Sequence, residues 1–222
     1  MIRGHVLVDF EGDGQFSIPG VLTAMRDLLR AKLVESIATL QAVLADETLA
    51  EALEHAAQVT SDAMKAGYKL LIAGNGGSAA DAQHLAAEFV CRLTADRPAM
   101  AAMALTTDTS ILTAMSNDHS YESVFERQVE ALGRPGDVFL GISTSGNSEN
   151  LVRALEMSRR RGLTTIIFTG NGGGAMGGHC DINVIVPSKV TTHIQEAHLA
   201  LEHVFCMLVE RMYFGIALEA YQ

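Results

Sequence analysis

Apolar positions along the chain fall into two kinds of segment. Short runs that are almost wholly apolar occur at 69–73, 100–105, 137–142, 164–169 and 182–186, and the longer segments between them carry apolar residues at helical spacing. A short apolar run bounded by turn residues is typical of a strand buried on both faces. Strands that alternate with helices predict an α/β fold, a five-stranded, mostly parallel sheet with helices on both faces.

The segments before the first predicted strand are helical. Leu and Val recur at helical spacing from 21 to 44, and Asp46 begins a second helix that runs to about 66. We expect these two helices to form a hairpin whose exposed apolar sides are candidates for packing between subunits. We interpret residues 1–24 as an N-terminal extension outside the core, and residues 25–222 as one domain.

Composition narrows the class of partner and the compartment. The 222 residues carry a formal net charge of −10, which argues against nucleic acid or an anionic membrane as the main partner. No apolar stretch reaches the roughly 18 residues that span a bilayer. The three cysteines, Cys91, Cys180 and Cys206, are isolated, odd in number and without CxxC spacing. This pattern indicates buried thiols in a reducing compartment, and we expect a cytoplasmic protein.

Two strand ends lead into loops suited to an anion. The first predicted strand ends in the glycine-rich turn 74–78, and the third ends in the hydroxyl-rich turn 143–148, each followed by a helix. Free N–H groups at a helix N-terminus favour a phosphate. A single glycine-rich turn is also compatible with a plain strand-to-helix connection, but two such turns together favour phosphate binding. Neither loop has the lysine of a P-loop, and no dinucleotide fingerprint is present.

The candidate chemistry lies on two helices. His84 and Glu88 are four residues apart, so they leave the same face of the helix after the first loop. The last predicted helix, 192–211, carries Gln195 and His203 eight residues apart, which can face one cleft at two heights, whereas His198 points elsewhere. Taken separately, His84 and Glu88 are also compatible with a surface pair, and His203 with a core histidine.

Two further segments complete the pattern. Residues 106–110 begin a helix, with Asp or Thr supplying the cap, and Asn117 and Asp118 close it. A helix over 121–132 follows. The glycine-rich segment 170–178 after the fourth strand is interpreted as a flexible surface loop.

Together these residues resemble the sugar isomerase (SIS) superfamily and, within it, the phosphoheptose isomerases. The resemblance extends from about Met25 to Gly215. It rests on the 74–78 loop with Asp81, His84 and Glu88, on Asn117 and Asp118, on the 143–148 loop, and on 194–198 continuing to His203. The lead into Ile194, residues 191–193, departs from the pattern common in the family.

The resemblance implies roles for individual residues. Substrate contacts would come from the loop residues Asn75, Gly76 and Gly77, from Asn117 and Asp118, and, around the phosphate, from Ser143, Thr144, Ser145 and Ser148. The family's zinc-binding set corresponds to His84, Glu88, Gln195 and His203, with one ion expected per subunit, and Glu88, Gln195 and His203 would also touch substrate. Imidazole and carboxylate suit zinc, whereas an amide is a weaker ligand. The resemblance also implies a homotetramer with active sites shared between subunits.

The implied activity is the isomerisation of D-sedoheptulose 7-phosphate to D-glycero-D-manno-heptose 7-phosphate, the first step towards ADP- or GDP-heptose precursors. Such a reaction passes through an enediol and needs a base, an acid and stabilisation of negative charge. We expect Glu88 as the base and His203 as the proton relay. Two alternatives remain. One is a non-catalytic SIS binding module like the replication-initiator regulator, a subgroup that lacks the counterparts of Glu88 and His203. The other is an isomerase of a different sugar phosphate, such as arabinose 5-phosphate.

Overall fold

A computed structural model of the chain describes residues 18–94 and 96–217. Of the predicted extension, residues 1–17 lie outside the described residues, and residues 18–24 form the beginning of the first helix. The chain divides into two compact units, residues 1–37 and 38–222. Among the described helices, none is both long enough and apolar enough to cross a membrane.

The second unit is built on a five-stranded sheet. Its strands are β1 (Leu70–Gly74), β2 (Ala102–Ala104), β3 (Val138–Ser143), β4 (Thr164–Thr169) and β5 (Ile182–Ile185). Their order in the sheet is β2-β1-β3-β4-β5, and every neighbouring pair is parallel. The predicted α/β class, strand number and strand positions are therefore confirmed, with boundaries that differ by at most two residues.

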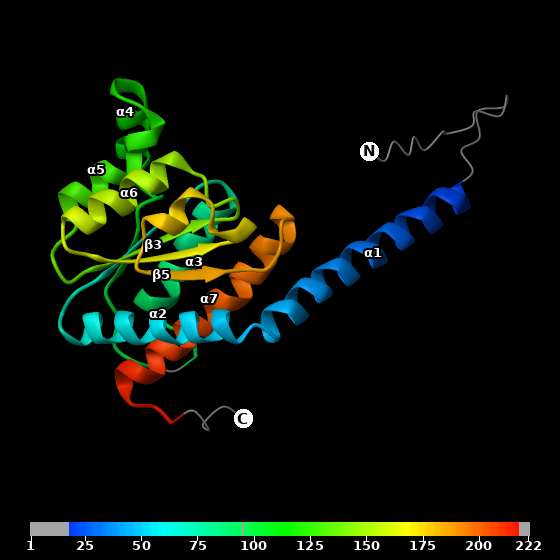
Figure 1. The fold of residues 1–222 in the computed structure, drawn as a ribbon, viewed down its shortest axis with the longest axis horizontal. Helices are drawn as coiled ribbons and strands as arrows, with labels where there is room; N and C mark the ends of the chain where they lie inside the picture. The colour runs from blue at the N-terminus through cyan, green and yellow to red at the C-terminus, as the bar shows by residue number, and fades with distance from the viewer. Residues whose placement is uncertain (1–17, 95, 218–222) are drawn as a thin grey trace. The chain divides into compact units, whose positions relative to one another are not determined.

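Helices cover both faces of this sheet (Figure 1). The helical elements of the unit are α2 (Glu47–Lys65), α3 (Gly77–Val90), α4 (Thr109–Asp118), η1 (Tyr121–Ser123), α5 (Val124–Leu132), α6 (Glu149–Arg160), η2 (Asn171–Gly173), η3 (Ala175–Gly178) and α7 (Thr191–Phe214). Alternate side chains of β1 enter two cores. Leu70 and Ile72 pack with α2, α3 and α7, whereas Leu71 and Ala73 pack with α5 and α6.

Helix boundaries follow the capping residues that the sequence provides. The Asp46 carboxylate accepts a hydrogen bond from the Leu49 N–H at 3.0 Å, and Asp108 accepts one from Ile111 at 3.0 Å. The sequence did not decide between Asp and Thr as the cap of this helix, and the structure shows that the cap is Asp108. Gly215, with φ +67°, ends α7 in the left-handed region that favours glycine. The predicted helix over 121–132 is present, but its first turn is the 3₁₀-helix η1.

Helix α1 (Ile18–Leu44) begins three residues before the predicted start at 21. Most of its large apolar residues are exposed, among them Leu22, Met25, Leu28, Leu29 and Leu33. The two N-terminal helices predicted before the sheet are present, and their packing as a hairpin stays a prediction.

The interpretation of 170–178 as a flexible loop is wrong. The segment forms η2 and η3 and packs against the hydroxyl-rich loop. Met176 N–H donates to the Gly146 carbonyl at 2.9 Å, and Ala175 N–H donates to Asn147 Oδ1 at 2.9 Å. Three consecutive glycines beginning at Gly172 have positive φ, so the segment needs glycine for a defined turn and not for mobility.

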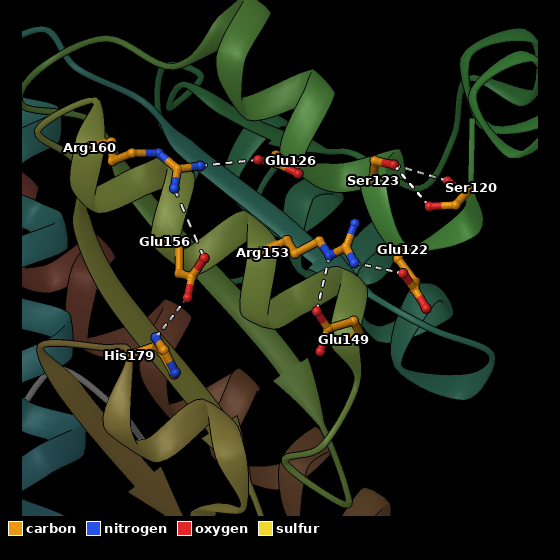
Figure 2. Close-up of polar contacts among 9 residues, drawn as sticks. All are labelled: Ser120, Glu122, Ser123, Glu126, Glu149, Arg153, Glu156, Arg160 and His179. Atoms are coloured by element: carbon orange, nitrogen blue, oxygen red, sulfur yellow. Dashed lines mark hydrogen bonds and ion pairs between the residues drawn. The ribbon is translucent and has the colours of Figure 1, made fainter. Parts of the chain in front are cut away.

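Ion pairs fasten α6 to the elements beside it (Figure 2). Arg153 lies 3.0 Å from Glu149 in its own helix and 2.7 Å from Glu122 of η1. About two turns further along α6, Arg160 lies 3.0 Å from Glu126 of α5. The helix that follows the hydroxyl-rich loop is therefore held in place along its exposed side.

Candidate active site

Helices α3 and α7 bring the predicted acid and imidazoles together. His84 Nε2 lies 2.9 Å from His203 Nε2 and 3.6 Å from Glu88 Oε1. The two imidazole rings meet edge to face, with centroids 5.1 Å apart and planes at 82°. Glu88 Oε1 and His203 Nε2 therefore both lie within 3.6 Å of His84 Nε2.

A second contact between the same helices places Gln195. Its Nε2 donates to Asp81 Oδ2 at 3.1 Å, and Asp81 precedes His84 by three residues on the same face of α3. Gly77, the first residue of α3, lies directly beneath this amide, because a Cβ at position 77 would come within 2.2 Å of Gln195 Nε2. Glycine at the end of the loop therefore permits the close approach of α7.

Arg97 fixes the far end of α3 against α7. Its guanidinium donates to the carbonyls of Glu88 and Phe89 at 2.8 Å each and to Glu210 Oε2 at 2.6 Å. Both side chains of the ion pair are buried, with 4% of Arg97 and 2% of Glu210 exposed. The arginine therefore fixes the backbone of Glu88 near the C-terminal end of α3.

Burial shifts the pKa values of three ionisable groups near the site, those of Glu202, Asp81 and His198. Burial, followed by the negative charge of Asp81, raises the pKa of Glu202 to about 8. Burial also raises the pKa of Asp81, against the opposing effects of Gln195 and His84. Burial lowers the pKa of His198 to about 4. His198 lies in the core beside Phe168, away from the paired imidazoles, as the sequence indicated.

The donor chemistry of the site fits zinc in part. Two imidazole nitrogens bound to one tetrahedral zinc lie about 3.3 Å apart, given zinc–nitrogen bonds of about 2.0–2.1 Å. His84 and His203 come close to this spacing, and the Glu88 oxygen lies at a similar separation from His84. Asp81 holds the Gln195 amide by its nitrogen, as an outer-shell partner orients a ligand. Among the described residues, no group of three His, Cys, Asp or Glu side chains has the arrangement of a metal site.

The hydroxyl-rich loop after β3 brings several hydroxyls together at the N-terminus of α6. Ser143 Oγ lies 3.4 Å from Ser145 Oγ and 3.1 Å from Ser148 Oγ, so three hydroxyls gather at one point. Ser148 is the N-cap of α6, yet its side chain makes no capping hydrogen bond, which leaves the first N–H groups of α6 available. Thr144 is half-buried in the same turn.

Asn75 of the glycine-rich loop is joined to α6 and η1. The amides of Asn75 and Asn150 exchange two hydrogen bonds of 2.9 Å each, and the Tyr121 hydroxyl donates to Asn75 Oδ1 at 2.8 Å. Gly76, with φ +56°, is the N-cap of α3 and leaves that helix terminus open as well. The glycine-rich loop is therefore joined to the first turn of α6, the helix that follows the hydroxyl-rich loop.

Asn117 and Asp118 are placed differently from the other predicted residues. They close α4 as expected, both are exposed, and Asn117 Nδ2 donates to the Asp118 carboxylate at 2.8 Å. In the described part of the chain their side chains make no hydrogen bond to either loop. Tyr121, a few residues further on, makes that contact.

Comparison with known proteins decides the family. The SIS domain family matches residues 34–170. A phosphoheptose isomerase of Aneurinibacillus thermoaerophilus is 50% identical over 190 residues, which cover 86% of this chain and 96% of the relative. One of Akkermansia muciniphila is 54% identical over 168 residues, covering 76% and 89%. The chain belongs to the phosphoheptose isomerase family of SIS-domain proteins. It is therefore an enzyme of the isomerase class, and the resemblance found in the sequence is confirmed.

A solved member of the phosphoheptose isomerase family has the same fold. The structure of phosphoheptose isomerase GmhA from Neisseria gonorrhoeae superposes with a TM-score of 0.79 at 41% sequence identity, covering 84% of this chain and 98% of that one. Residues 191–193, which depart from the sequence pattern common in the family, are still helical, because α7 begins at Thr191.

Several residues that shape this phosphoheptose isomerase site were assigned no role from the sequence. Asp81 could have been found, since it shares the face of α3 with His84. Asn150 and Tyr121 carry no local signal, because their contacts to Asn75 span 75 and 46 residues of sequence. Arg97 likewise meets Glu210 across 113 residues.

Proposed function

We propose that the protein interconverts D-sedoheptulose 7-phosphate and D-glycero-D-manno-heptose 7-phosphate through an enediol. The convergence of Glu88, His84 and His203 at the interface of α3 and α7 is the observation that carries this proposal. Aldose–ketose isomerisation requires a base close to an acidic C–H and a proton donor close to the carbonyl oxygen. A carboxylate and an imidazole held on adjacent helices supply both groups.

In this proposal Glu88 removes the proton from the carbon next to the carbonyl, and His203 delivers a proton to oxygen. The Glu88 side chain is 17% exposed, so it is partly shielded from water and still open to a ligand. His84, in contact with both groups, orients them. Gln195, with its nitrogen held by Asp81, offers its oxygen to a substrate hydroxyl or to a metal.

The phosphate of the substrate occupies the loop of Ser143, Thr144, Ser145 and Ser148, where hydroxyls and the N-terminus of α6 receive it. In the same proposal, the residues that contact the sugar are Asn75, Gly76, Gly77, Asn117 and Asp118. Binding of the phosphate holds the reacting carbons of the sugar beside the catalytic side chains. Binding energy from a part of the substrate that does not react is thus used to orient the part that does.

Zinc is proposed as the cofactor of an open, labile site, where His84, His203, Glu88 and Gln195 would hold it and Glu88 would be released to act as the base when substrate binds. A bound zinc ion polarises a carbonyl and an adjacent hydroxyl. If zinc takes part in turnover, a chelator that removes it abolishes activity, and added zinc restores it. Full activity in metal-depleted protein, with metal content measured on the same sample, confines zinc to a structural role.

The direct test of the proposed function is an isomerase assay with purified protein, zinc and D-sedoheptulose 7-phosphate. Formation of an aldoheptose phosphate is the expected result. Arabinose 5-phosphate and ribulose 5-phosphate serve as competing substrates in parallel reactions. The absence of aldoheptose phosphate, or faster turnover of a pentose phosphate, contradicts the proposed substrate.

We also propose a cytoplasmic homotetramer that acts in heptose precursor synthesis for lipopolysaccharide and related glycans. Support for the oligomer comes from the exposed apolar side chains of α1 and from a groove of about 560 Å³ between α2 and α7, lined by residues that include Leu53, Val204 and Leu208. Support for the compartment comes from the cysteines, all three of which are free.

A further inference from the structure

The side chain of Asn75 is held by more contacts than a surface loop residue needs. Its amide is paired with that of Asn150 by two reciprocal hydrogen bonds, and the Tyr121 hydroxyl adds a third. The three residues come from three elements, the loop after β1, the first turn of α6 and the beginning of η1. Asn150 is 3% exposed, so this network is anchored in the protein interior.

The hydrogen bonds of this network determine which groups of the Asn75 amide remain available to a ligand. A carboxamide has two lone pairs on oxygen and two N–H groups. Asn75 Oδ1 accepts from both Asn150 and Tyr121, and Asn75 Nδ2 donates one N–H to Asn150. One N–H is left, so Asn75 can offer a ligand a donor and has no further acceptor to offer. The network thus determines which chemical group Asn75 recognises.

The partners of Asn75 are themselves fixed by the ion pairs of α6 (Figure 2). Glu122, the neighbour of Tyr121, lies 2.7 Å from Arg153, which also binds Glu149 beside Asn150. At the ends of the same turn, the hydroxyls of Ser120 and Ser123 lie 3.1 Å apart. Arg153 therefore connects the segment that carries Tyr121 to the helix that carries Asn150.

We propose that Asn150 and Tyr121 are positioning residues for substrate binding. They hold the Asn75 amide as a donor to a substrate oxygen, and they couple the glycine-rich loop to the start of α6, where the phosphate is received. The sugar chain and its phosphate are thereby bound at a fixed separation. This inference rests on the proposed function, in which Asn75 contacts the sugar and the loop 143–148 holds the phosphate.

The test is steady-state kinetics with D-sedoheptulose 7-phosphate on Tyr121→Phe, Asn150→Ala, Asn75→Ala and the double variant Asn75→Ala/Asn150→Ala. Losing a contact made equally to substrate and transition state raises KM and leaves kcat unchanged. We expect KM to rise about 5- to 10-fold in Tyr121→Phe and Asn150→Ala, with kcat within about twofold of wild type. Because both residues act through Asn75, the double variant has the KM of Asn75→Ala alone.

Tyr68→Phe is the matched control, since Tyr68 packs over Gly136 at the other end of the sheet. We expect this variant to have wild-type kinetics. If Asn150→Ala lowers the melting temperature, Tyr121→Phe, which removes one exposed hydroxyl, still tests the inference.

Three results would overturn the inference. They are an unchanged KM in both Tyr121→Phe and Asn150→Ala, a fall in kcat at constant KM, or additive effects of Asn75→Ala and Asn150→Ala. Failure of the proposed function is distinguished from these by two other results, wild-type protein without isomerase activity, or Asn75→Ala with wild-type KM.

Discussion

His198 and Glu202 lie one turn apart on α7, and both are fully buried within the described part of the chain. Neither carboxylate oxygen of Glu202 makes a hydrogen bond among the described residues, and the polar group that faces His198 is the backbone of Thr169. Burial lowers the pKa of the imidazole to about 4 and raises the pKa of the carboxyl to about 8, so both groups are uncharged in the folded protein near neutral pH. The buried face of α7 therefore carries no charge at these two positions near neutral pH.

Stability should depend on the ionisation of His198. Its pKa is about 4 in the folded state and about 6.5 in the unfolded state, so the unfolded state binds more protons between these values. The free energy of unfolding therefore falls as the pH is lowered from 6.5 to 4, by up to about 3 kcal/mol from this group. This contribution is absent in His198→Gln. The difference in free energy of unfolding between wild type and variant should therefore shrink as the pH is lowered from 6.5 to 4.

Urea unfolding of both proteins at a series of pH values measures this effect. His55→Gln is the control, because His55 is an exposed histidine on α2. A constant difference between wild type and His198→Gln from pH 7 to pH 4.5 would argue against a buried neutral imidazole. The group of β4 that faces His198 is the backbone of Thr169, which carries no charge that could replace the effect.

At the scale of elements, the position of α3 against α7 depends on the buried pair Arg97–Glu210. Removing one member of such a pair leaves an uncompensated charge in the interior. We expect Arg97→Met to lower the free energy of unfolding by about 3–5 kcal/mol, and the double variant Arg97→Met/Glu210→Gln to recover part of the loss.

Denaturant unfolding of these variants is compared with Arg127→Met, which breaks the exposed pair Arg127–Glu130. That control should lose less than about 1 kcal/mol. If Arg97→Met and Arg127→Met lose the same free energy of unfolding, the buried pair Arg97–Glu210 contributes no more to stability than an exposed ion pair.

The segment formed by η2 and η3 packs against the hydroxyl-rich loop 143–148. A Cβ at Gly146 would come within 2.2 Å of the Gly173 carbonyl oxygen, whereas a Cβ at Gly172 meets nothing within 4 Å. Both glycines have positive φ, of 66° and 74°, so alanine strains the backbone similarly at either position. The two positions differ in the space available for a side chain and in segment, since Gly146 lies in the hydroxyl-rich loop and Gly172 in η2.

We therefore expect Gly146→Ala to weaken the binding of inorganic phosphate about tenfold or more, and Gly172→Ala to bind it like wild type. Isothermal titration calorimetry with phosphate measures both variants. If the two substitutions weaken binding to the same extent, backbone strain alone explains the effect and η2–η3 does not support the loop.

The sequence was sufficient for elements whose signals are local. The strands could be predicted because each is a short run buried on both faces, and the loops because glycine and hydroxyl residues follow directly after them. His84 and Glu88 share a helix face by spacing alone. The contacts of Arg97, Asn150 and Tyr121 join residues far apart in the chain, and only the packing of α3, α6, α7 and η1 reveals them. The segment 170–178 was misread because glycine signals either mobility or a tight turn.

At the scale of the whole molecule, the exposed apolar residues of α1 are the main evidence for assembly. A single chain has a mass of 23.7 kDa, and we expect light scattering to report about four times this value. Introducing two charges in Leu29→Glu/Leu33→Glu makes burial of this surface costly, so the variant should be smaller than the wild-type oligomer.

Arg26→Glu, at an exposed polar position of the same helix, is the control and should keep the wild-type mass. A monomeric wild-type protein, or an unchanged mass in the double variant, would remove the support for a tetramer assembled through α1. Activity measured on the same fractions shows whether the active site is complete in one subunit.

The central claim is that Glu88 abstracts a proton from carbon during isomerisation. Its most direct test is the exchange of substrate hydrogen with solvent, followed by proton NMR in D₂O with D-sedoheptulose 7-phosphate as substrate. The account predicts that wild-type enzyme forms aldoheptose phosphate with deuterium at the carbon next to the carbonyl. It also predicts that folded Glu88→Gln exchanges this position at least about a thousandfold more slowly. Exchange by Glu88→Gln at the wild-type rate would contradict the claim.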